Sequence, residues 1–274
     1  MNNKSRILAI GAHPDDCDIK AGGCAMLWAR AGCTVKFVSV TNGESGHHQM
    51  SGQTLVARRT AEAQAAAKVA GIEYLVMDNP DGRLLPGLEE RSKLMRVIRE
   101  FRPDLILTHR PNDYHPDHRY TSQLVQDCSY LVGVPNVCPE VPYLEKAPVI
   151  AYFQDNFQKP IPFRADVAVD IDSVFAEKVR MLACHESQFF EWLPWIGAHG
   201  LDPSEDPKER LRILEAFARD LSQPDKDTRF TLEEWYGALN ASKVQFMESF
   251  EACEYGSEMD PNAIRRLFPV PETW

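Results

Sequence analysis

Short apolar runs alternate, over the first 110 residues or so, with longer segments whose apolar residues recur at helical spacing. The runs at residues 6–12 (RILAIGA) and 35–40 (VKFVSV) are typical of strands that are buried on both faces. The segments at 21–31 and 54–70 are typical of helices, and a glycine follows each of them. The same reasoning predicts strands at 74–77 and 105–108 and an amphipathic helix at 88–101.

Strands that alternate with helices predict βαβ units, so we expect an α/β, Rossmann-like fold. Its sheet should be mostly parallel, with helices on both faces. The second half of the chain adds expected strands at 149–153 and 167–171 and expected helices at 172–188, 208–221 and 232–255. No linker or repeat interrupts the chain. We therefore expect one domain over 1–274, with a core at about 5–190 and a helical C-terminal elaboration at about 191–274.

Charge and cysteine content limit the partners and the compartment. The chain carries 40 acidic and 30 basic residues, a net charge of -10, and no basic run typical of nucleic-acid binding. Its seven cysteines form no C-x-x-C pair, which argues against a disulfide framework and favours a reducing cytoplasm. The apolar run near the N-terminus is too short for a signal sequence, and no window approaches the roughly 18 apolar residues of a membrane span. We expect a cytoplasmic protein that binds neither nucleic acid nor membranes.

Two segments rich in histidine and aspartate follow the first and the fourth predicted strands. Residues 12–18 read AHPDDCD, and residues 109–118 read HRPNDYHPDH. In open α/β sheets the ligand lies beyond the carboxyl ends of the strands, so both segments should meet at one edge. Packing alone explains two such turns poorly, and the sequence therefore predicts a metal site there.

His13, Asp16 and His118 are the candidate metal ligands. His13 and Asp16 are three residues apart in a turn stiffened by Pro14, so both side chains could reach one point. Two nitrogens and one carboxylate oxygen suit zinc and leave a fourth position for water. Iron(II), manganese(II) and cobalt(II) accept the same ligands. We expect one zinc ion per chain, which would acidify water and polarise a carbonyl for hydrolysis.

Neighbouring residues are candidates for proton transfer and for charge stabilisation. Asp15 adjoins a candidate ligand without being needed as one, so it is the candidate general base and then the general acid to the leaving amine. His115 could stabilise a developing oxyanion if it is protonated. Asp117 could orient one of the imidazoles.

The two segments together resemble the LmbE-like (PIG-L) deacetylase family. The resemblance extends to TNGESG at 41–46, RTAE at 59–62, the pair Asp81–Gly82, and Lys178 with HESQ at 185–188. It covers roughly residues 5–190. It implies a Rossmann-like fold, a zinc ion, and removal of the acetyl group from N-acetylglucosaminyl compounds. Because family members are similar to small symmetric assemblies, it also implies a homo-oligomer.

The resemblance also implies residue roles. They are His13, Asp16 and His118 as zinc ligands, Asp15 as general base, His115 as the oxyanion-side group, and Arg59 and Gln188 as substrate contacts. One departure is that the family places a glutamate after the aspartate pair, where this chain has Cys17 and Asp18. We interpret Cys17 as a small buried residue, with a thiolate near the metal as the alternative, whereas Asp18 could replace the glutamate or cap the first helix.

The resulting hypothesis is a zinc-dependent hydrolase that removes the N-acetyl group from a small GlcNAc-type conjugate. Two alternatives stay open: a metal-dependent hydrolase of another bond, such as a phosphoester or a non-sugar amide, and a non-catalytic sugar-binding protein. The aromatic run at 189–195 (FFEWLPW) is typical of core or inter-subunit packing, or else of a wall for a sugar ring. His47 and His48 are expected in an exposed loop, and His199 has no evident chemical partner.

Overall fold

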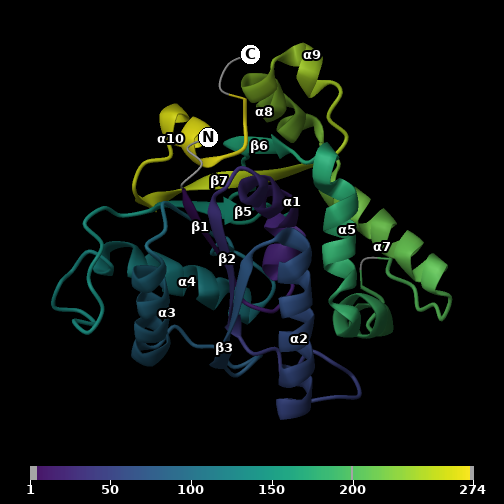
Figure 1. The fold of residues 1–274 in the computed structure, drawn as a ribbon, viewed down its shortest axis with the longest axis horizontal. Helices are drawn as coiled ribbons and strands as arrows, with labels where there is room; N and C mark the ends of the chain where they lie inside the picture. Colours follow the sequence, from purple (N-terminus) through teal and green to yellow (C-terminus); the bar gives the residue numbers. More distant parts are fainter. Residues whose placement is uncertain (1–4, 199, 272–274) are drawn as a thin grey trace.

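A seven-stranded sheet forms the centre of the computed structural model, which describes residues 5–198 and 200–271 (Figure 1). The strand order is β3-β2-β1-β4-β5-β7-β6. The first five strands pair in parallel, whereas β7 is antiparallel to β5 and β6. His199 lies outside the described residues. The strands are β1 Arg6–Gly11, β2 Thr34–Thr41, β3 Glu73–Asn79, β4 Leu105–Thr108, β5 Val149–Phe153, β6 Val167–Asp170 and β7 Met247–Gly256.

Helices cover both faces of the sheet, so every residue of β1 after Arg6 and every residue of β4 is buried. Figure 1 shows α1, α2 and α5 on one face and α3 and α4 on the other. The predicted α/β fold with a mostly parallel sheet is therefore confirmed. These helices are α1 Asp16–Arg30, α2 Gly52–Ala70, α3 Leu88–Phe101, α4 Pro116–Leu131 and α5 Phe175–Ala183.

The second half of the chain is less regular than predicted. The helix expected at 172–188 is divided into a 3-10 turn, helix α5 and a π-helix, and helix α4 was not predicted. No helix in the described part of the chain is long and apolar enough to cross a membrane. The remaining helical elements are η1 Asp172–Val174, η2 Ser187–Trp192, α6 Leu193–Trp195, α7 Pro207–Ser222, α8 Lys226–Tyr236, α9 Ala238–Ala241 and α10 Pro261–Leu267.

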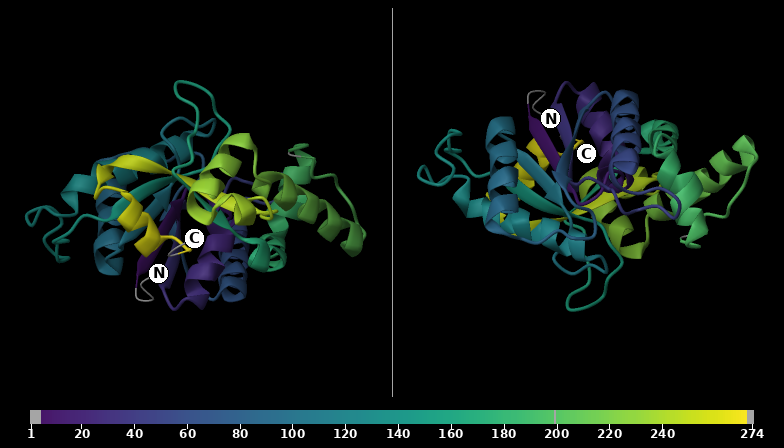
Figure 2. Two further views of the ribbon diagram at one scale, coloured as in Figure 1. Left: turned by 90° about the horizontal axis from the view of Figure 1, so that it is seen from above. Right: turned by 90° about the horizontal axis from the view of Figure 1, so that it is seen from below.

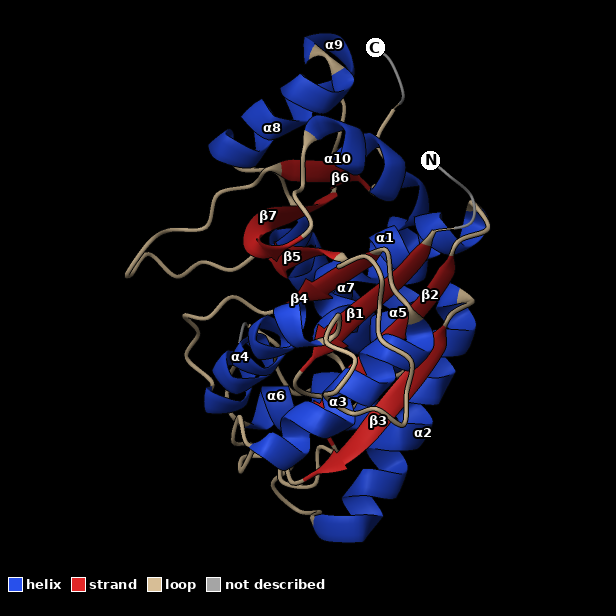
Figure 3. Cartoon of the chain, turned by 90° about the vertical axis from the view of Figure 1, so that its left-hand side faces the viewer, coloured by secondary structure: helices blue, strands red, loops and turns tan. Residues whose placement is uncertain are grey.

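The helix predicted at 232–255 is wrong, because its second half is strand β7. Met247, Phe250 and Cys253 are spaced three apart, a spacing that also suits one face of a helix. Pairing with β5 and β6 overrides that local preference, since β7 completes the sheet between them. The C-terminal region is thus helical in α7 to α10 but also supplies an internal strand. Figure 3 shows the long loop between β5 and β6 extending away from this part of the sheet.

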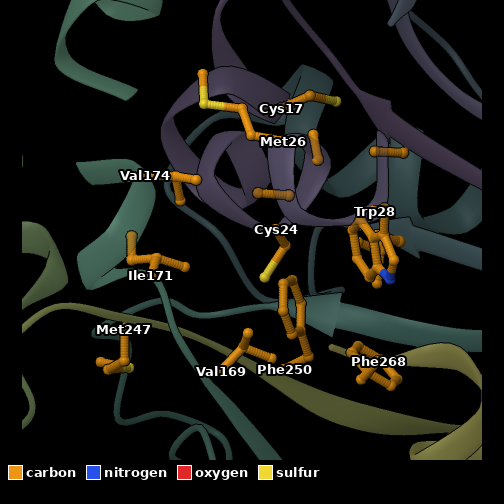
Figure 4. Close-up of a cluster of buried hydrophobic side chains, with 14 of the residues drawn as sticks. Cys17, Cys24, Met26, Trp28, Val169, Ile171, Val174, Met247, Phe250 and Phe268 are labelled. Atoms are coloured by element: carbon orange, nitrogen blue, oxygen red, sulfur yellow. The ribbon is translucent and has the colours of Figure 1, made fainter. Parts of the chain in front are cut away.

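Helix α1 packs against β6 and β7 through a tight apolar interface (Figure 4). At its centre the buried carboxylate of Glu248 accepts hydrogen bonds from the N–H groups of Gly23 and Cys24, at 2.8 and 2.7 Å. The same carboxylate lies 2.8 Å from the ammonium of Lys178, which is also buried. A buried ion pair with these extra hydrogen bonds is costly to break from one side. This cluster fixes how α1, and with it the turn that precedes α1, sits on the sheet.

Two adjacent glycines of α1 provide a test of that packing. A Cβ atom at Gly23 would lie 2.8 Å from Ile171 Cγ2, whereas a Cβ at Gly22 would lie 3.2 Å from the flexible Met181 thioether. Both alanine substitutions gain helix propensity equally. We expect Gly23→Ala to be less stable than Gly22→Ala by about 1–3 kcal/mol, because only Gly23→Ala forces a branched side chain to move. Urea unfolding measures the difference, and equal stabilities would contradict the close approach of α1 to Ile171.

Candidate metal centre and active site

The turn between β1 and α1 is fixed by the side chain of Asp16. Its Oδ2 accepts hydrogen bonds from the N–H groups of Ala12 and His13, at 2.9 and 2.7 Å. Gly11 is required nearby, since a Cβ there would lie 2.7 Å from Asp16 Cβ. Asp15 has a φ of 146°, which is rare for a residue other than glycine. Such strain persists only where surrounding contacts maintain it, and it is concentrated at functional sites.

Three electron-pair donors converge beyond the carboxyl ends of β1 and β4. His13 Nδ1 lies 3.2 Å from His118 Nε2 and 3.5 Å from Asp16 Oδ2. Asp16 Oδ1 lies 3.4 Å from His118 Nε2. Donors that share one tetrahedral zinc ion are about 3.3–3.5 Å apart, given metal–ligand distances of about 2.0–2.2 Å. The structure thus brings together the three residues predicted as ligands, at separations that suit a metal ion.

The partners of the two imidazoles are compatible with a cation between them. His13 Nε2 lies 3.1 Å from Asp81 Oδ1 and 3.5 Å from Asp117 Oδ2, and His118 Nδ1 lies 3.1 Å from Asp113 Oδ2. A carboxylate only accepts hydrogen bonds, so these ring nitrogens carry the protons. The nitrogens that face each other then present lone pairs next to the Asp16 carboxylate. Such a set of donors requires a positive charge at its centre, and carboxylates behind the imidazoles are typical of metal-binding histidines.

The pKa shifts of Asp16 and His13 agree with a positive charge at the centre of the cluster. Burial alone would raise the pKa of Asp16, but the imidazoles of His118 and His109 hold it well below its usual value. Burial alone would lower the pKa of His13, but the surrounding carboxylates, led by Asp117, raise it well above its usual value. The cluster therefore favours one bound positive charge, whether a proton or a metal ion.

Asp81 and Asp113 were not assigned roles from the sequence, and for His109 the sequence left open a place behind the ligands or a purely structural one. Asp81 and Asp113 orient His13 and His118, and His109 stacks on His118 with ring centroids 4.1 Å apart. Asp113 could have been found as the acid within HRPNDYHPDH, and Asp81 as part of the resemblance. Burial lowers the pKa of His109 to about 4, so its ring is neutral. Asp117 contacts His13, in line with its expected orienting position.

Asp15 is buried beside Arg59. Arg59 Nη2 lies 3.3 Å from Asp15 Oδ2 and donates to the carbonyl of Pro14 at 3.0 Å. Burial raises the pKa of Asp15 to about 6, although the charge of Arg59 opposes the increase. A carboxylate that titrates near neutrality is suited to proton transfer. The Arg59 guanidinium also contacts the Gly43 carbonyl and the Asp81 carboxylate. The expected role of Arg59 in substrate contact stays a prediction.

His115 lies next to the cluster and is the N-cap residue of α4. Its Nδ1 accepts a hydrogen bond from the N–H of Asp117, so in the neutral ring the proton is on Nε2. Burial and the neighbouring His13 lower the pKa of His115. The sequence indicated an oxyanion role for His115 on the condition that its ring is protonated, whereas the lowered pKa favours the neutral ring, which can still donate from Nε2.

The other candidates are buried. Gln188 donates to the Gly46 carbonyl at 3.0 Å, and its role in substrate contact stays a prediction. Asp18 lies 3.0 Å from His185 Nε2 and accepts a hydrogen bond from the Tyr74 hydroxyl, and the idea that it replaces the family's glutamate stays a prediction. Cys17 is fully buried in the apolar cluster of Figure 4, and burial raises the pKa of its thiol well above the usual value, which favours the packing interpretation.

The expectation that His47 is exposed is wrong. Its ring is buried, Nδ1 accepts from the N–H groups of Gln49 and Met50, and Nε2 lies 2.9 Å from Glu191. The sequence could not indicate this, because Glu191 is far away along the chain.

Asp113→Asn tests whether the carboxylate behind His118 contributes to metal binding. The amide keeps the shape of the side chain but loses the negative charge that polarises the imidazole. We expect the affinity for zinc to fall by about 10- to 100-fold, as measured by competition with a chelating dye. Asp78→Asn is the matched control, because Asp78 is exposed and contacts Lys93 only among the described ion pairs. Equal affinities of the two variants would remove Asp113 from the metal centre.

Several known proteins are similar to this chain. The family described as PIG-L: GlcNAc-PI de-N-acetylase matches residues 8–129, which contain both segments of the cluster. The diacetylchitobiose deacetylase of Thermococcus kodakarensis is 30% identical over 211 residues, 72% of this chain and 76% of the relative. The 4-oxalmesaconate hydratase of Pseudomonas putida is 26% identical over 193 residues, 68% of this chain and 74% of the relative.

A solved structure extends the likeness over most of the fold. The N,N'-diacetylchitobiose deacetylase of Pyrococcus horikoshii has a TM-score of 0.69 at 23% identity, and the likeness covers 96% of this chain and 86% of that one. Together with the coverage of the Thermococcus relative, these findings identify the family. The chain belongs to the PIG-L family.

Proposed function

We propose that the protein is a zinc-dependent N-deacetylase that removes the acetyl group from a small, uncharged N-acetylglucosamine-type compound. The observation that carries the proposal is the convergence of lone pairs from His13, His118 and Asp16 beside a strained, buried Asp15. Relatives named as deacetylases support the reaction class.

His13, Asp16 and His118 would hold the metal ion. Asp81 and Asp113 would keep the two imidazoles in the tautomers that bind it. A bound divalent zinc ion supplies Lewis acidity, which polarises the acyl carbonyl and makes water easier to deprotonate.

Asp15 is the group suited to moving the proton. At neutral pH it is mostly ionised, yet a pKa of about 6 leaves it basic enough to accept a proton from the attacking water. The same proton is then available for the nitrogen of the leaving amine, which would otherwise depart as an unstable anion. Arg59 holds the Asp15 carboxylate in place through its 3.3 Å contact and restrains the turn through Pro14.

His115 would bind the carbonyl oxygen as negative charge develops on it. The N–H of Asp117 holds the ring with its proton on Nε2, so a neutral His115 can donate one hydrogen bond. Because the ring is already oriented by the start of α4, little reorganisation is needed during the reaction.

The charge of the cluster favours an uncharged substrate. Besides Asp16, four carboxylates surround it, those of Asp15, Asp81, Asp113 and Asp117, against the single guanidinium of Arg59. Five carboxylates, against the two positive charges of a zinc ion and the one of Arg59, would leave the cluster negative, so a neutral acetamido sugar would meet less repulsion there than a polyanionic substrate.

Several further properties remain part of the proposal. They are a single domain over 1–274, homo-oligomeric assembly, a cytoplasmic location, and the absence of a nucleic-acid partner, all of which follow from the sequence and the family resemblance.

The decisive experiment combines metal content with activity. Purified protein is analysed for bound metal, stripped with a chelator, and assayed for acetate release from N-acetylglucosamine and N,N'-diacetylchitobiose with and without added zinc. We expect zinc to restore acetate release. Metal binding without acetate release would direct attention to the other bonds in the panel, phosphoesters and simple amides, and a protein that binds sugar without turnover would support the non-catalytic alternative.

Asp15→Asn tests the role of the general base. The amide cannot accept the proton, so we expect kcat to fall by about 10²- to 10⁴-fold while the zinc content stays unchanged. Asp78→Asn again serves as the control and should retain both properties. Loss of zinc from Asp15→Asn would show instead that Asp15 is a metal ligand.

A further inference from the structure

Tyr114 lies beside the candidate metal centre, and the proposed reaction does not use it. Its ring centroid is 5.7 Å from that of His118, a candidate ligand. It is also 5.7 Å from that of His115, the group expected to bind the carbonyl oxygen. Tyr114 therefore contacts two of the residues that would hold the acetamido group of a substrate.

These two neighbours leave much of the Tyr114 ring free. The ring centroids of His115 and His118 are only 5.0 Å apart, so both imidazoles lie on the same side of Tyr114. Their planes are inclined to the phenol by 89° and 76°, which makes the contacts edge-to-face rather than stacked. Tyr114 keeps 72% of its surface exposed. The phenol thus presents free ring surface next to the cluster.

The Tyr114 hydroxyl has no hydrogen-bond partner in the described part of the chain. A phenol keeps its proton at neutral pH, so it can donate one hydrogen bond and accept another. The surroundings raise the pKa of Tyr114, first by excluding water from the hydroxyl and then through the negative charges of Asp16 and Asp113. The hydroxyl is therefore within electrostatic reach of the candidate metal centre and still has a hydrogen bond to offer.

The backbone that carries Tyr114 is held on both sides. The Arg119 guanidinium donates to the carbonyls of Asp113 and Tyr114, at 2.6 and 3.0 Å. The Asp113 carboxylate accepts a hydrogen bond from the N–H of His115 at 2.9 Å, which closes the turn. A ligand that binds to Tyr114 would therefore lose little free energy in ordering this segment.

The loop between β5 and β6 contacts the same segment. Both views of Figure 2 show this loop projecting from the body of the molecule. The side chain of Asn112 donates to the Lys159 carbonyl at 3.1 Å, and the ring centroid of Phe157 lies 6.3 Å from that of Tyr114. Tyr114 is thus next to a second aromatic ring, and the two supply apolar surface beside an acidic cluster.

The exposure of Tyr114 indicates which part of a substrate it would contact. A pocket for the methyl group of the acetyl would need buried walls, whereas Tyr114 is mostly exposed. The sugar ring is the larger part of the substrate, and its hydroxyl groups can stay partly in water. A pyranose has an apolar C–H face with a polar rim, which matches the ring face and the hydroxyl of a phenol.

We propose that Tyr114 is a specificity-determining residue, whose ring packs against the C–H face of the reacting N-acetylglucosamine ring and whose hydroxyl donates a hydrogen bond to the same sugar. The inference rests on the proposed deacetylase function. The metal centre and His115 recognise the acetamido group, which every N-acetyl compound carries. Tyr114 recognises the pyranose to which that group is attached.

The test separates the ring from the hydroxyl. Wild type, Tyr114→Phe and Tyr114→Ala are loaded with zinc and assayed with N-acetylglucosamine. We expect KM to rise by about two- to fivefold in Tyr114→Phe, which loses only the hydroxyl. It should rise by about five- to twentyfold in Tyr114→Ala, which also loses the ring, while kcat stays within about twofold. Tyr130→Ala is the matched control, because Tyr130 is similarly exposed near the other end of α4, and KM should not change.

Zinc content and acyl length distinguish the proposal from two other roles. All variants should bind as much zinc as wild type. Loss of zinc from Tyr114→Ala would mean that Tyr114 only supports His118, and the proposal would be wrong. N-butyrylglucosamine is assayed in parallel. If faster hydrolysis of this longer acyl group is the only effect of Tyr114→Ala, the ring borders the acyl group instead of the sugar, which also overturns the proposal.

Binding without turnover separates failure of this contact from failure of the deacetylase proposal. Wild type and Tyr114→Ala are titrated with N-acetylglucosamine in a calorimeter. Weaker binding by Tyr114→Ala supports the contact even if no acetate is released. Acetate release with equal KM and equal binding in the two proteins overturns the contact and leaves the deacetylase proposal standing. Absence of both binding and acetate release in wild type overturns both.

Discussion

The carboxylate of Asp16 is the point on which the candidate active site depends. One of its oxygens accepts the N–H groups of Ala12 and His13 and so fixes the turn after β1, while the other faces His118, which comes from a separate segment after β4. The backbone turn, the start of α1 and the convergence of the imidazoles therefore share one side chain. Because this carboxylate is buried, it is stable as an anion only with positive charge near it. The cluster of donors and the need for a cation follow from the same constraint.

The need for positive charge beside Asp16 also accounts for the other carboxylates around the site. Each candidate imidazole ligand has a carboxylate behind it, which fixes its tautomer and directs a lone pair inward. The cluster is thus negative apart from Arg59 and the cation it would hold. Asp15 shares this environment but is not part of the converging donors, and its raised pKa results from burial. The candidate base and the candidate metal site are thus distinguished by position alone, although they are adjacent in sequence.

The sequence predicted the part of the fold in which local pattern and tertiary context agree. The buried strands β1, β2 and β4 are short apolar runs, and their order in the chain places AHPDD and HPDH at one edge of the sheet. It did not predict β7, because Met247, Phe250 and Cys253 suit a helix as well as a strand and only the vacant position between β5 and β6 decides. Likewise His47 and Asp113 depend on partners or geometry that no local pattern contains. The candidate ligands and Asp117, which belong to the motifs, were predicted, whereas the contacts of Asp81 and Asp113 with the imidazoles were not.

The segments that supply the reacting groups differ from others that lie around them. The candidate ligands and the candidate base come from the turns after β1 and β4, within the region that the family description covers. The loop after β2 contacts η2 and α6, which lie beyond that region, and His48 stacks on Trp195 there. A relative named as a hydratase and relatives named as deacetylases are both similar to this chain, so membership of the family does not by itself identify the substrate. Substrate selection then depends on the side chains around the candidate metal centre, among them the carboxylates of Asp81, Asp113 and Asp117 that make it negative.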